Sequence, residues 1–237
     1  MSSNTSSDTA GQAQAQAIHH ELRNAENSAA FVLPKLQSMK ESNPKLKLLD
    51  VGAGSGTITA SFAKLLPDGH VTGVDLKEDI LPRARTVAEI AGVKNIKFQQ
   101  GDSKKLPFED GTFDVVFCHQ MLTHIAAPYD ALREMLRVTK PGGIVAAREG
   151  DFKTEAVYPD SPGLLKFHKL AATMMGAAGG TETAGRQLLP WALKAGADST
   201  KITLTFGTWS YVTQRDKDTW GTFYNIIPLH FPCVGLG

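Results

Sequence analysis

The sequence predicts an α/β fold with a doubly wound, mostly parallel sheet flanked by helices. Between residues 46 and 150, short apolar runs alternate with helical patterns of about ten residues or more, which is typical of parallel strands joined by crossover helices. The run FDVVFCH at 113–119 is almost continuously apolar, as expected for a strand that is covered on both faces. With 237 residues, the chain is long enough for one full-sized domain with its own core.

The expected elements follow one another along this region. Strands are expected at residues 46–51, 70–75, 95–102, 113–119 and 143–150, and helices at 57–66, 78–91 and 127–139. Glycine, proline or both follow each of these helices, where neither residue favours continuing it. A helical stretch at 18–40, in which Pro34 either interrupts the helix or starts a second short one, precedes the first strand.

After Asp151 the alternation of strands and helices stops. Two helical segments are expected at 161–180 and 183–196, followed by an alternating strand at 200–213. Helices inserted beyond the fifth strand would lie near the mouth of a ligand site. They would either cover a substrate there or only pack against the sheet, and the sequence leaves both readings open.

Composition excludes several classes of protein. The formal net charge of +1 gives no general attraction to nucleic acid, and no apolar run approaches the roughly 18 residues of a membrane span. Two cysteines are too few for a disulfide framework, and no metal-ligand set is apparent. Residues 1–17 are rich in Ser, Gln and Ala, lack a secretory signal pattern, and are expected to be disordered. These features predict a cytoplasmic protein.

The segment LLDVGAGSGTIT at 48–59 places glycines at every second position after the first strand: Gly52, Gly54 and Gly56. Glycine lets the backbone approach a ligand closely and adopt left-handed torsions. A dinucleotide fingerprint would place its third glycine one residue later, and the GK[ST] of a phosphate-binding loop is missing. Alone, the turn is equally compatible with a tight bend.

Acidic residues near three neighbouring strand ends favour a ligand site. Asp50 precedes the glycine turn, where it would suit a ligand that carries an amino group and a sulfonium. Asp75 closes the second strand, where a carboxylate can accept hydrogen bonds from ribose hydroxyls, and Asp102 closes the third. Singly, each aspartate is more often a turn or cap residue.

Four segments together carry a family resemblance. LLDVGAGSGTIT, VTGVDL, GDSKKLPFEDGTFDVVFCHQMLTHI and LRVTKPGGIVAAREGD resemble, in order and spacing, the motifs of class I S-adenosylmethionine-dependent methyltransferases. They look most like the UbiE-like branch of ubiquinone and menaquinone biosynthesis. The resemblance implies methyl transfer from S-adenosylmethionine to a small-molecule acceptor, such as a quinone, lipid or secondary metabolite.

The resemblance also implies a set of cofactor-binding residues. The glycine turn would pass beneath the methionine part, Asp75 would hold the ribose, and Leu76 would flank the adenine. Asp102 and Ser103 would meet the adenine rim, and His119 would lie beside the methionyl portion. The full expected set is Asp50, Gly52, Ala53, Gly54, Gly56, Asp75, Leu76, Gly101, Asp102, Ser103 and His119.

A general base is needed only if the acceptor is a hydroxyl or a carbon acid. His124 and Asp151, which follow the fourth and fifth strands, are the candidates for this catalytic role.

The chain departs from the family near its end. The methyltransferase domain is expected at 18–222 with a sixth strand at 201–212, but residues 223–237 form an atypical tail with prolines and glycines. The last, antiparallel strand of the family is therefore expected to be missing or replaced. An open edge on the fifth strand would favour homodimerisation.

Two other functions remain open at this point. A nicotinamide-dependent oxidoreductase would share the fold and Asp75, but would need the other glycine spacing. A non-catalytic cofactor-binding or interaction protein would be consistent with an incomplete sheet.

Overall fold

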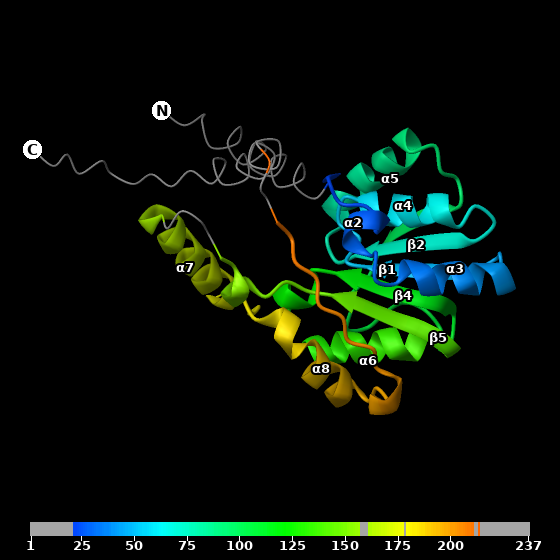
Figure 1. Cartoon of the computed structure of the whole chain (residues 1–237). Helices are drawn as coiled ribbons and strands as arrows, with labels where there is room; N and C mark the ends of the chain where they lie inside the picture. Colours follow the sequence, from blue (N-terminus) through cyan, green and yellow to red (C-terminus); the bar gives the residue numbers. More distant parts are fainter. Residues whose placement is uncertain (1–20, 157–160, 178, 211–212, 214–237) are drawn as a thin grey trace, which may run out of the picture. The chain divides into compact units, whose positions relative to one another are not determined.

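A computed structural model describes residues 21–156, 161–177, 179–210 and 213 (Figure 1). The chain divides into two compact units, and the larger, Asn24–Thr205, contains the sheet. The smaller unit joins the residues up to Arg23 with those from Phe206 onward. In its described part, the Arg23 guanidinium lies 5.9 Å from the centroid of the Trp209 ring.

The larger unit is built on a sheet of five parallel strands. These are β1 (Lys47–Val51), β2 (His70–Asp75), β3 (Ile96–Gln100), β4 (Phe113–His119) and β5 (Thr139–Arg148). Their order is β3-β2-β1-β4-β5, and every neighbouring pair is parallel. The predicted α/β fold with a doubly wound parallel sheet is confirmed. The chain order reverses between β1 and β4, which is where ligands bind in such sheets.

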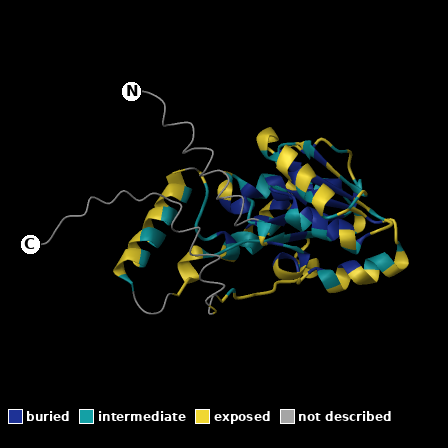
Figure 2. Cartoon of the chain, turned by 90° about the horizontal axis from the view of Figure 1, so that it is seen from above, coloured by how far each residue is buried: buried dark blue, intermediate teal, exposed yellow. Residues whose placement is uncertain are grey.

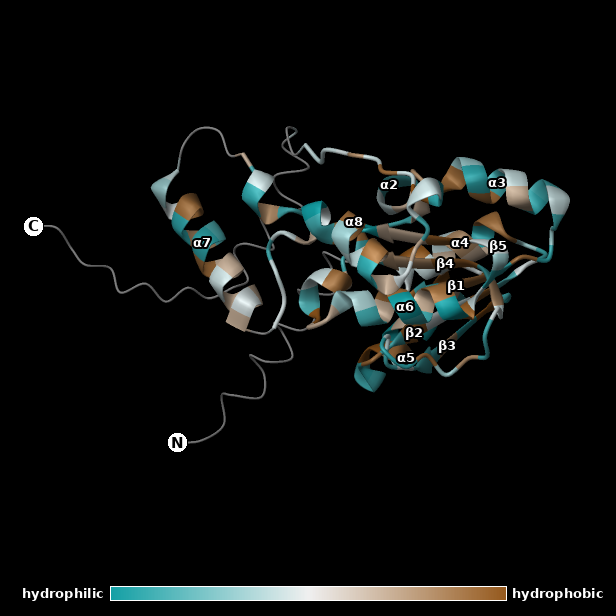
Figure 3. Cartoon of the chain, turned by 90° about the horizontal axis from the view of Figure 1, so that it is seen from below, coloured by the Kyte–Doolittle hydropathy of each residue, from teal (hydrophilic) through white to brown (hydrophobic). Residues whose placement is uncertain are grey.

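Helices cover both faces of the sheet. One face packs against α2 (Ala25–Ser28), α3 (Leu33–Ser42), α4 (Thr57–Leu65) and α5 (Leu81–Ile90), and the other packs against α6 (Pro128–Val138) and α8 (Ala184–Ala195). Successive residues of β1 point to opposite faces of the sheet. Leu48 packs in the core on the α4 side, and Leu49 packs in the core on the α6 side. Figure 3 shows β1 and β4 as largely hydrophobic, as strands covered on both sides must be.

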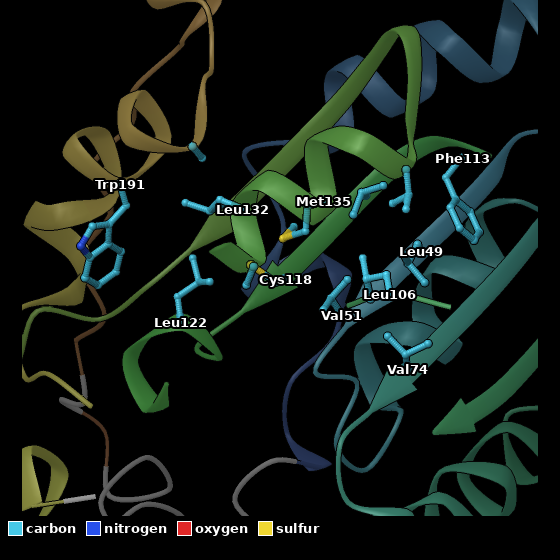
Figure 4. Packing of buried hydrophobic residues seen from close by; sticks show 14 of the residues in the cluster. Leu49, Val51, Val74, Leu106, Phe113, Cys118, Leu122, Leu132, Met135 and Trp191 are labelled. Atoms are coloured by element: carbon cyan, nitrogen blue, oxygen red, sulfur yellow. The ribbon is translucent and has the colours of Figure 1, made fainter. Parts of the chain in front are cut away.

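The core between the sheet and α6 is the largest of the three buried hydrophobic clusters in the described part of the chain. Figure 4 shows Leu132 and Met135 of α6 over Val51 and Cys118, with Trp191 of α8 alongside. Every one of these side chains is at most 8% exposed. This core fixes the end of β4 and the start of α6, between which the candidate residue His124 lies.

The helix α7 (Pro162–Ala177) differs from the other long helices because none of its residues is buried. Figure 2 shows α7 in exposed and intermediate colours along its whole length. It follows the short 3-10 helix η3 (Phe152–Thr154), which leaves the end of β5. The segment expected to be inserted after the fifth strand is therefore present, but α7 does not contribute to the core.

In its described part, the stretch 18–40 is helical as expected: α2 ends at Ser28, and Pro34 lies in the first turn of a second helix, α3, which starts at Leu33. Two expected elements need correction. β5 begins at Thr139, before the Pro-Gly-Gly sequence, because a register shift opposite Phe113–Val115 accommodates these residues.

The second correction concerns the strand expected at 200–213. The structure has a short 3-10 helix, η4 (Ser199–Lys201), and then no regular structure over residues 202–210. Alternating side chains give a strand its two faces, but a strand also needs a partner for its backbone hydrogen bonds. Within the described residues, β5 pairs only with β4, so residues 202–210 do not extend the sheet.

The predictions for both chain ends stay predictions. Residues 1–17 and 223–237 lie outside the described residues, as does part of the domain expected at 18–222.

Candidate cofactor site at the carboxyl edge of the sheet

The register of the strands brings the predicted acids and the glycine turn to one edge. Val51 lies opposite Val74 and Cys118, and Asp75 lies opposite Gln100. His119, the last residue of β4, lies opposite Arg148. Because all five strands are parallel, each connection that leaves a carboxyl end starts at this edge.

The three glycines of the turn have different surroundings, although all have positive φ: +77° at Gly52, +53° at Gly54 and +79° at Gly56. A Cβ on Gly52 would lie 2.6 Å from Met121 Cγ, and a Cβ on Gly56 would lie 2.8 Å from the Phe98 ring. A Cβ on Gly54 would meet nothing within 4 Å. Gly52 and Gly56 are therefore needed for packing, and Gly54 presents its backbone to open space.

The turn is hydrogen-bonded to the end of β2. The backbone nitrogens of Gly52 and Ala53 both donate to the Val74 carbonyl at 2.9 Å. The Gly54 nitrogen donates to Asp75 Oδ2 at 2.9 Å, and the Lys77 nitrogen donates to Asp75 Oδ1 at 3.0 Å. These bonds fix the Asp75 carboxylate at the edge of the turn, with further lone pairs left for a ligand.

Asp50 lies inside β1 and is 2% exposed. Its Oδ2 accepts a hydrogen bond of 2.6 Å from the Thr59 hydroxyl on α4. Burial raises the pKa of Asp50 to about 7, and the nearby charge of Asp75 adds to this rise, whereas the Thr59 bond opposes it. The Asp50 carboxyl is therefore poised to exchange a proton near neutral pH.

The residues after β2 and β3 form the outer part of the edge. Leu76 is 63% exposed. Gly101 donates its N–H to the Asp75 carbonyl at 2.9 Å. Asp102 Oδ1 accepts from the Lys104 nitrogen at 2.9 Å, and Ser103 is half-buried beside it.

The end of β4 is tightly held. His119 is buried, and Gln120 follows it with φ +48°, a left-handed conformation that is uncommon for a non-glycine residue. Glu149, just after β5, accepts the backbone N–H groups of Met121 and Leu122 with Oε1, at 3.0 and 2.8 Å. Strain of this kind is often found at functional sites.

The two candidate catalytic residues have contrasting surroundings. His124 ends the 3-10 helix η2 (Leu122–His124) and is exposed. Asp151 is bound by both Arg186 Nε at 2.5 Å and Arg186 Nη2 at 2.9 Å. The Arg186 guanidinium lowers the pKa of Asp151, so its carboxylate is a weaker base than an ordinary aspartate.

Three residues of this site escaped the sequence analysis: Thr59, Met121 and Arg186. Met121 and Arg186 act on predicted residues from distant parts of the chain, and Thr59 acts on Asp50 from the adjoining helix α4, so each contact becomes visible only in the folded chain. Met121 follows the left-handed residue Gln120 and lies over Gly52. This backbone angle is a feature of the structure and cannot be read from the sequence. Among the described residues, no group of three His, Cys, Asp or Glu side chains is arranged to hold a metal ion.

Comparison with known proteins identifies the family. Residues 42–196 match the model of the family described as a methyltransferase domain. An uncharacterised methyltransferase of Schizosaccharomyces pombe is 34% identical over 206 residues, covering 84% of this chain and 71% of that protein. A demethylmenaquinone methyltransferase of Staphylococcus aureus is 39% identical over 113 residues, but this match covers only 47% of this chain and 46% of the relative.

A solved structure supports the same assignment. A Bacillus halodurans protein assigned as a methyltransferase superposes with a TM-score of 0.54 at 27% identity, covering 69% of this chain and 68% of its own. No helix in the described part of the chain has the length and hydropathy needed to cross a bilayer. From its fold, its matched family and these relatives, the chain belongs to the S-adenosylmethionine-dependent methyltransferases.

Proposed function

We propose that this chain transfers a methyl group from S-adenosylmethionine to a small-molecule acceptor at the carboxyl edge of its sheet. The acceptor classes that fit best are a quinone, a lipid or a secondary metabolite. The partial likeness to demethylmenaquinone methyltransferase, over 47% of the chain, supports a place near the UbiE-like branch.

One observation carries the proposal: Gly54 faces open space directly beside the fixed carboxylate of Asp75. A backbone without a side chain can contact a flat or bulky ligand closely, and the carboxylate can accept hydrogen bonds from two neighbouring hydroxyls. The ribose and methionine parts of the cofactor need these two features next to each other. The residues present therefore fit this cofactor.

The remaining proposed contacts follow from the same edge. Leu76 would offer an apolar surface to the adenine, and Gly101, Asp102 and Ser103 would lie at its rim. Ala53 and Gly52 would lie under the methionine part, with Asp50 and His119 closing the inner end. The bound cofactor supplies an activated methyl on a sulfonium, so the protein needs mainly to position the acceptor and exclude water.

The two candidates for a general base differ in their surroundings. His124 is exposed and can meet an acceptor that enters from solvent, whereas the Asp151 carboxylate is held by Arg186. We therefore expect His124→Asn to lower the rate with a hydroxyl acceptor. Asp151→Asn is expected to affect the rate indirectly, because it weakens the contact with Arg186 that helps to position α8.

Calorimetry with S-adenosylmethionine, its demethylated product and NAD tests the proposal. Binding of the first two with no binding of NAD is expected, and Asp75→Asn should weaken both. Binding of NAD alone would instead favour the oxidoreductase. Binding of the cofactor without transfer of labelled methyl to any acceptor in a panel of quinones, lipids and phenols would favour the non-catalytic protein.

Two further expectations concern the cellular location and the oligomeric state of the protein. The cysteine content favours the cytoplasm, and the outer edge of β5, which pairs with no strand among the described residues, favours a homodimer. Size-exclusion chromatography coupled to light scattering would test the second expectation.

A further inference from the structure

A cavity of about 370 Å³ lies between η3, α7 and residue 182. Its lining combines an aromatic ring (Phe152), two lysines (Lys153, Lys169), an imidazole (His168), two small residues (Ala172, Thr173) and one carboxylate (Glu182). This volume falls within the range of about 300–1,000 Å³ that is typical of small-molecule sites. None of these residues belongs to the cofactor site proposed above.

The positive charge of the cavity is only partly balanced. Lys153 Nζ lies 3.0 Å from Glu182 Oε1, so this lysine already has a carboxylate partner. His168 Nδ1 lies 2.5 Å from Oε2 of Glu155, which pairs the imidazole with a residue outside the lining. Lys169 forms no ion pair with the residues that the structure describes. Its ammonium is therefore the charge available to a ligand.

The cavity is connected to the cofactor edge through short contacts. The Phe152 nitrogen donates to the Glu182 carbonyl at 2.8 Å, which joins the two sides of the cavity. The preceding residue, Thr181, is bonded to Thr123 both ways: its nitrogen donates to the Thr123 carbonyl at 2.9 Å, and its carbonyl accepts from the Thr123 hydroxyl at 2.7 Å. Thr123 follows two residues after Met121, which lies against Gly52. The cavity wall is thus hydrogen-bonded to the segment after β4, and Met121 of that segment packs against the glycine turn.

From these contacts we propose that the cavity between η3 and α7 binds the acceptor, and that the acceptor is an aromatic or acyl carboxylate. The anionic group lies against Lys169, and the apolar body lies along Phe152 and Ala172. This inference names the acceptor class of the site and so rests on the proposed methyl transfer. In this proposal α7 forms one side of the binding cavity, which accounts for its lack of buried residues.

Binding of a matched pair of probes, benzoate and benzamide, tests the proposal without the cofactor. We expect the full chain to bind benzoate more tightly than benzamide, by about tenfold, and to lose this preference in high salt. Lys169→Met should remove the preference and leave benzamide binding within about twofold, because it removes the charge and keeps the length of the side chain. Lys166→Met, one turn earlier on α7 and outside the cavity lining, is the matched control and should change neither.

Phe152→Ala separates the aromatic contact from the charge. It should weaken benzoate and benzamide alike, because both share the ring, whereas Lys169→Met affects benzoate alone. Equal loss of benzoate binding in Lys166→Met and Lys169→Met would overturn the proposal, since any surface lysine would then suffice. So would equal affinity of the parent chain for both probes. Calorimetry with S-adenosylmethionine on the same variants keeps the two proposals apart: a chain that binds the cofactor but fails the probe test loses only the acceptor assignment.

Discussion

The carboxylate of Asp75 accepts a hydrogen bond of 2.9 Å from the backbone nitrogen of Gly54, 21 residues earlier in the chain. This bond joins the glycine turn after β1 to the end of β2, at the carboxyl edge of the sheet. The turn conformation and the position of the carboxylate therefore depend on each other. Changes at either residue should alter ligand binding more than they alter the core.

Gly54→Ala should weaken cofactor binding, because its new methyl group would enter the open space in front of the turn. The left-handed torsion should also cost about 1–2 kcal/mol of stability. Gly92→Ala is the matched control, since Gly92 also has positive φ and a Cβ added there would meet nothing within 4 Å, but it follows α5 away from the turn. Denaturant melts should show similar losses for both variants, while calorimetry shows weaker cofactor binding for Gly54→Ala alone. Equal cofactor affinity in the two variants would contradict the proposed site.

Gly56→Ala should destabilise the fold much more than Gly54→Ala. The new Cβ would lie 2.8 Å from the Phe98 ring and 2.9 Å from Ala84 Cβ, so the contact between β3 and α5 would have to open. Crowding added to the left-handed torsion predicts a loss of about 2–5 kcal/mol. Thermal melts measure it, and a transition temperature equal to that of Gly54→Ala would show that this contact yields freely.

Asp50 should make the protein less stable as pH rises from about 4 to about 7. Its pKa is about 7 in the folded chain, against an ordinary value of 3.8, so in this window the folded state holds a proton that the unfolded state has released. The contribution of this proton to the free energy of unfolding is fully present below the ordinary pKa of 3.8. As the pH rises from there to about 7, the contribution falls by at most about 1.4 kcal/mol per pH unit. Asp50→Asn stays neutral, so its stability relative to the parent should increase between pH 5 and pH 8. Urea melts at the two pH values measure this change, and parallel pH dependence in both proteins would argue against a buried, proton-holding Asp50.

Arg137 should be essential for the loop between β3 and β4. Its guanidinium donates to the carbonyls of Leu106 and Phe108 at 3.1 and 2.9 Å, and it also pairs with Glu134 and Asp110, each at 2.7 Å. Arg137→Lys keeps the charge but cannot reproduce this fork, so we expect a loss of about 1–3 kcal/mol, measured by urea melts.

Arg133→Lys is the control for Arg137→Lys. Arg133 lies on the same helix, is 54% exposed and pairs only with Asp130 among the ion pairs of the described residues. Exposed pairs of this kind contribute about 0–1 kcal/mol, so this variant should melt close to the parent. Similar melts for the two variants would mean that the carbonyl contacts of Arg137 add little.

The sequence was sufficient for the sheet because the signal there is local. The limits of β2 and β4 match the expected 70–75 and 113–119, since turn residues bound each apolar run. The expected strand at 200–213 failed because pairing depends on a neighbour that no local pattern reveals. The same reason separates Asp75, which a motif identifies, from Thr59 and Arg186, which become relevant only when α4 and α8 pack beside the acids that they contact.

The absence of buried residues in α7 also bears on how such a chain can change over time. Substitutions along this helix leave no void in the interior, so they escape the penalty that restricts the strands. With the acceptor site proposed above, selection can therefore alter which molecules bind beside α7 while the scaffold beneath keeps its stability.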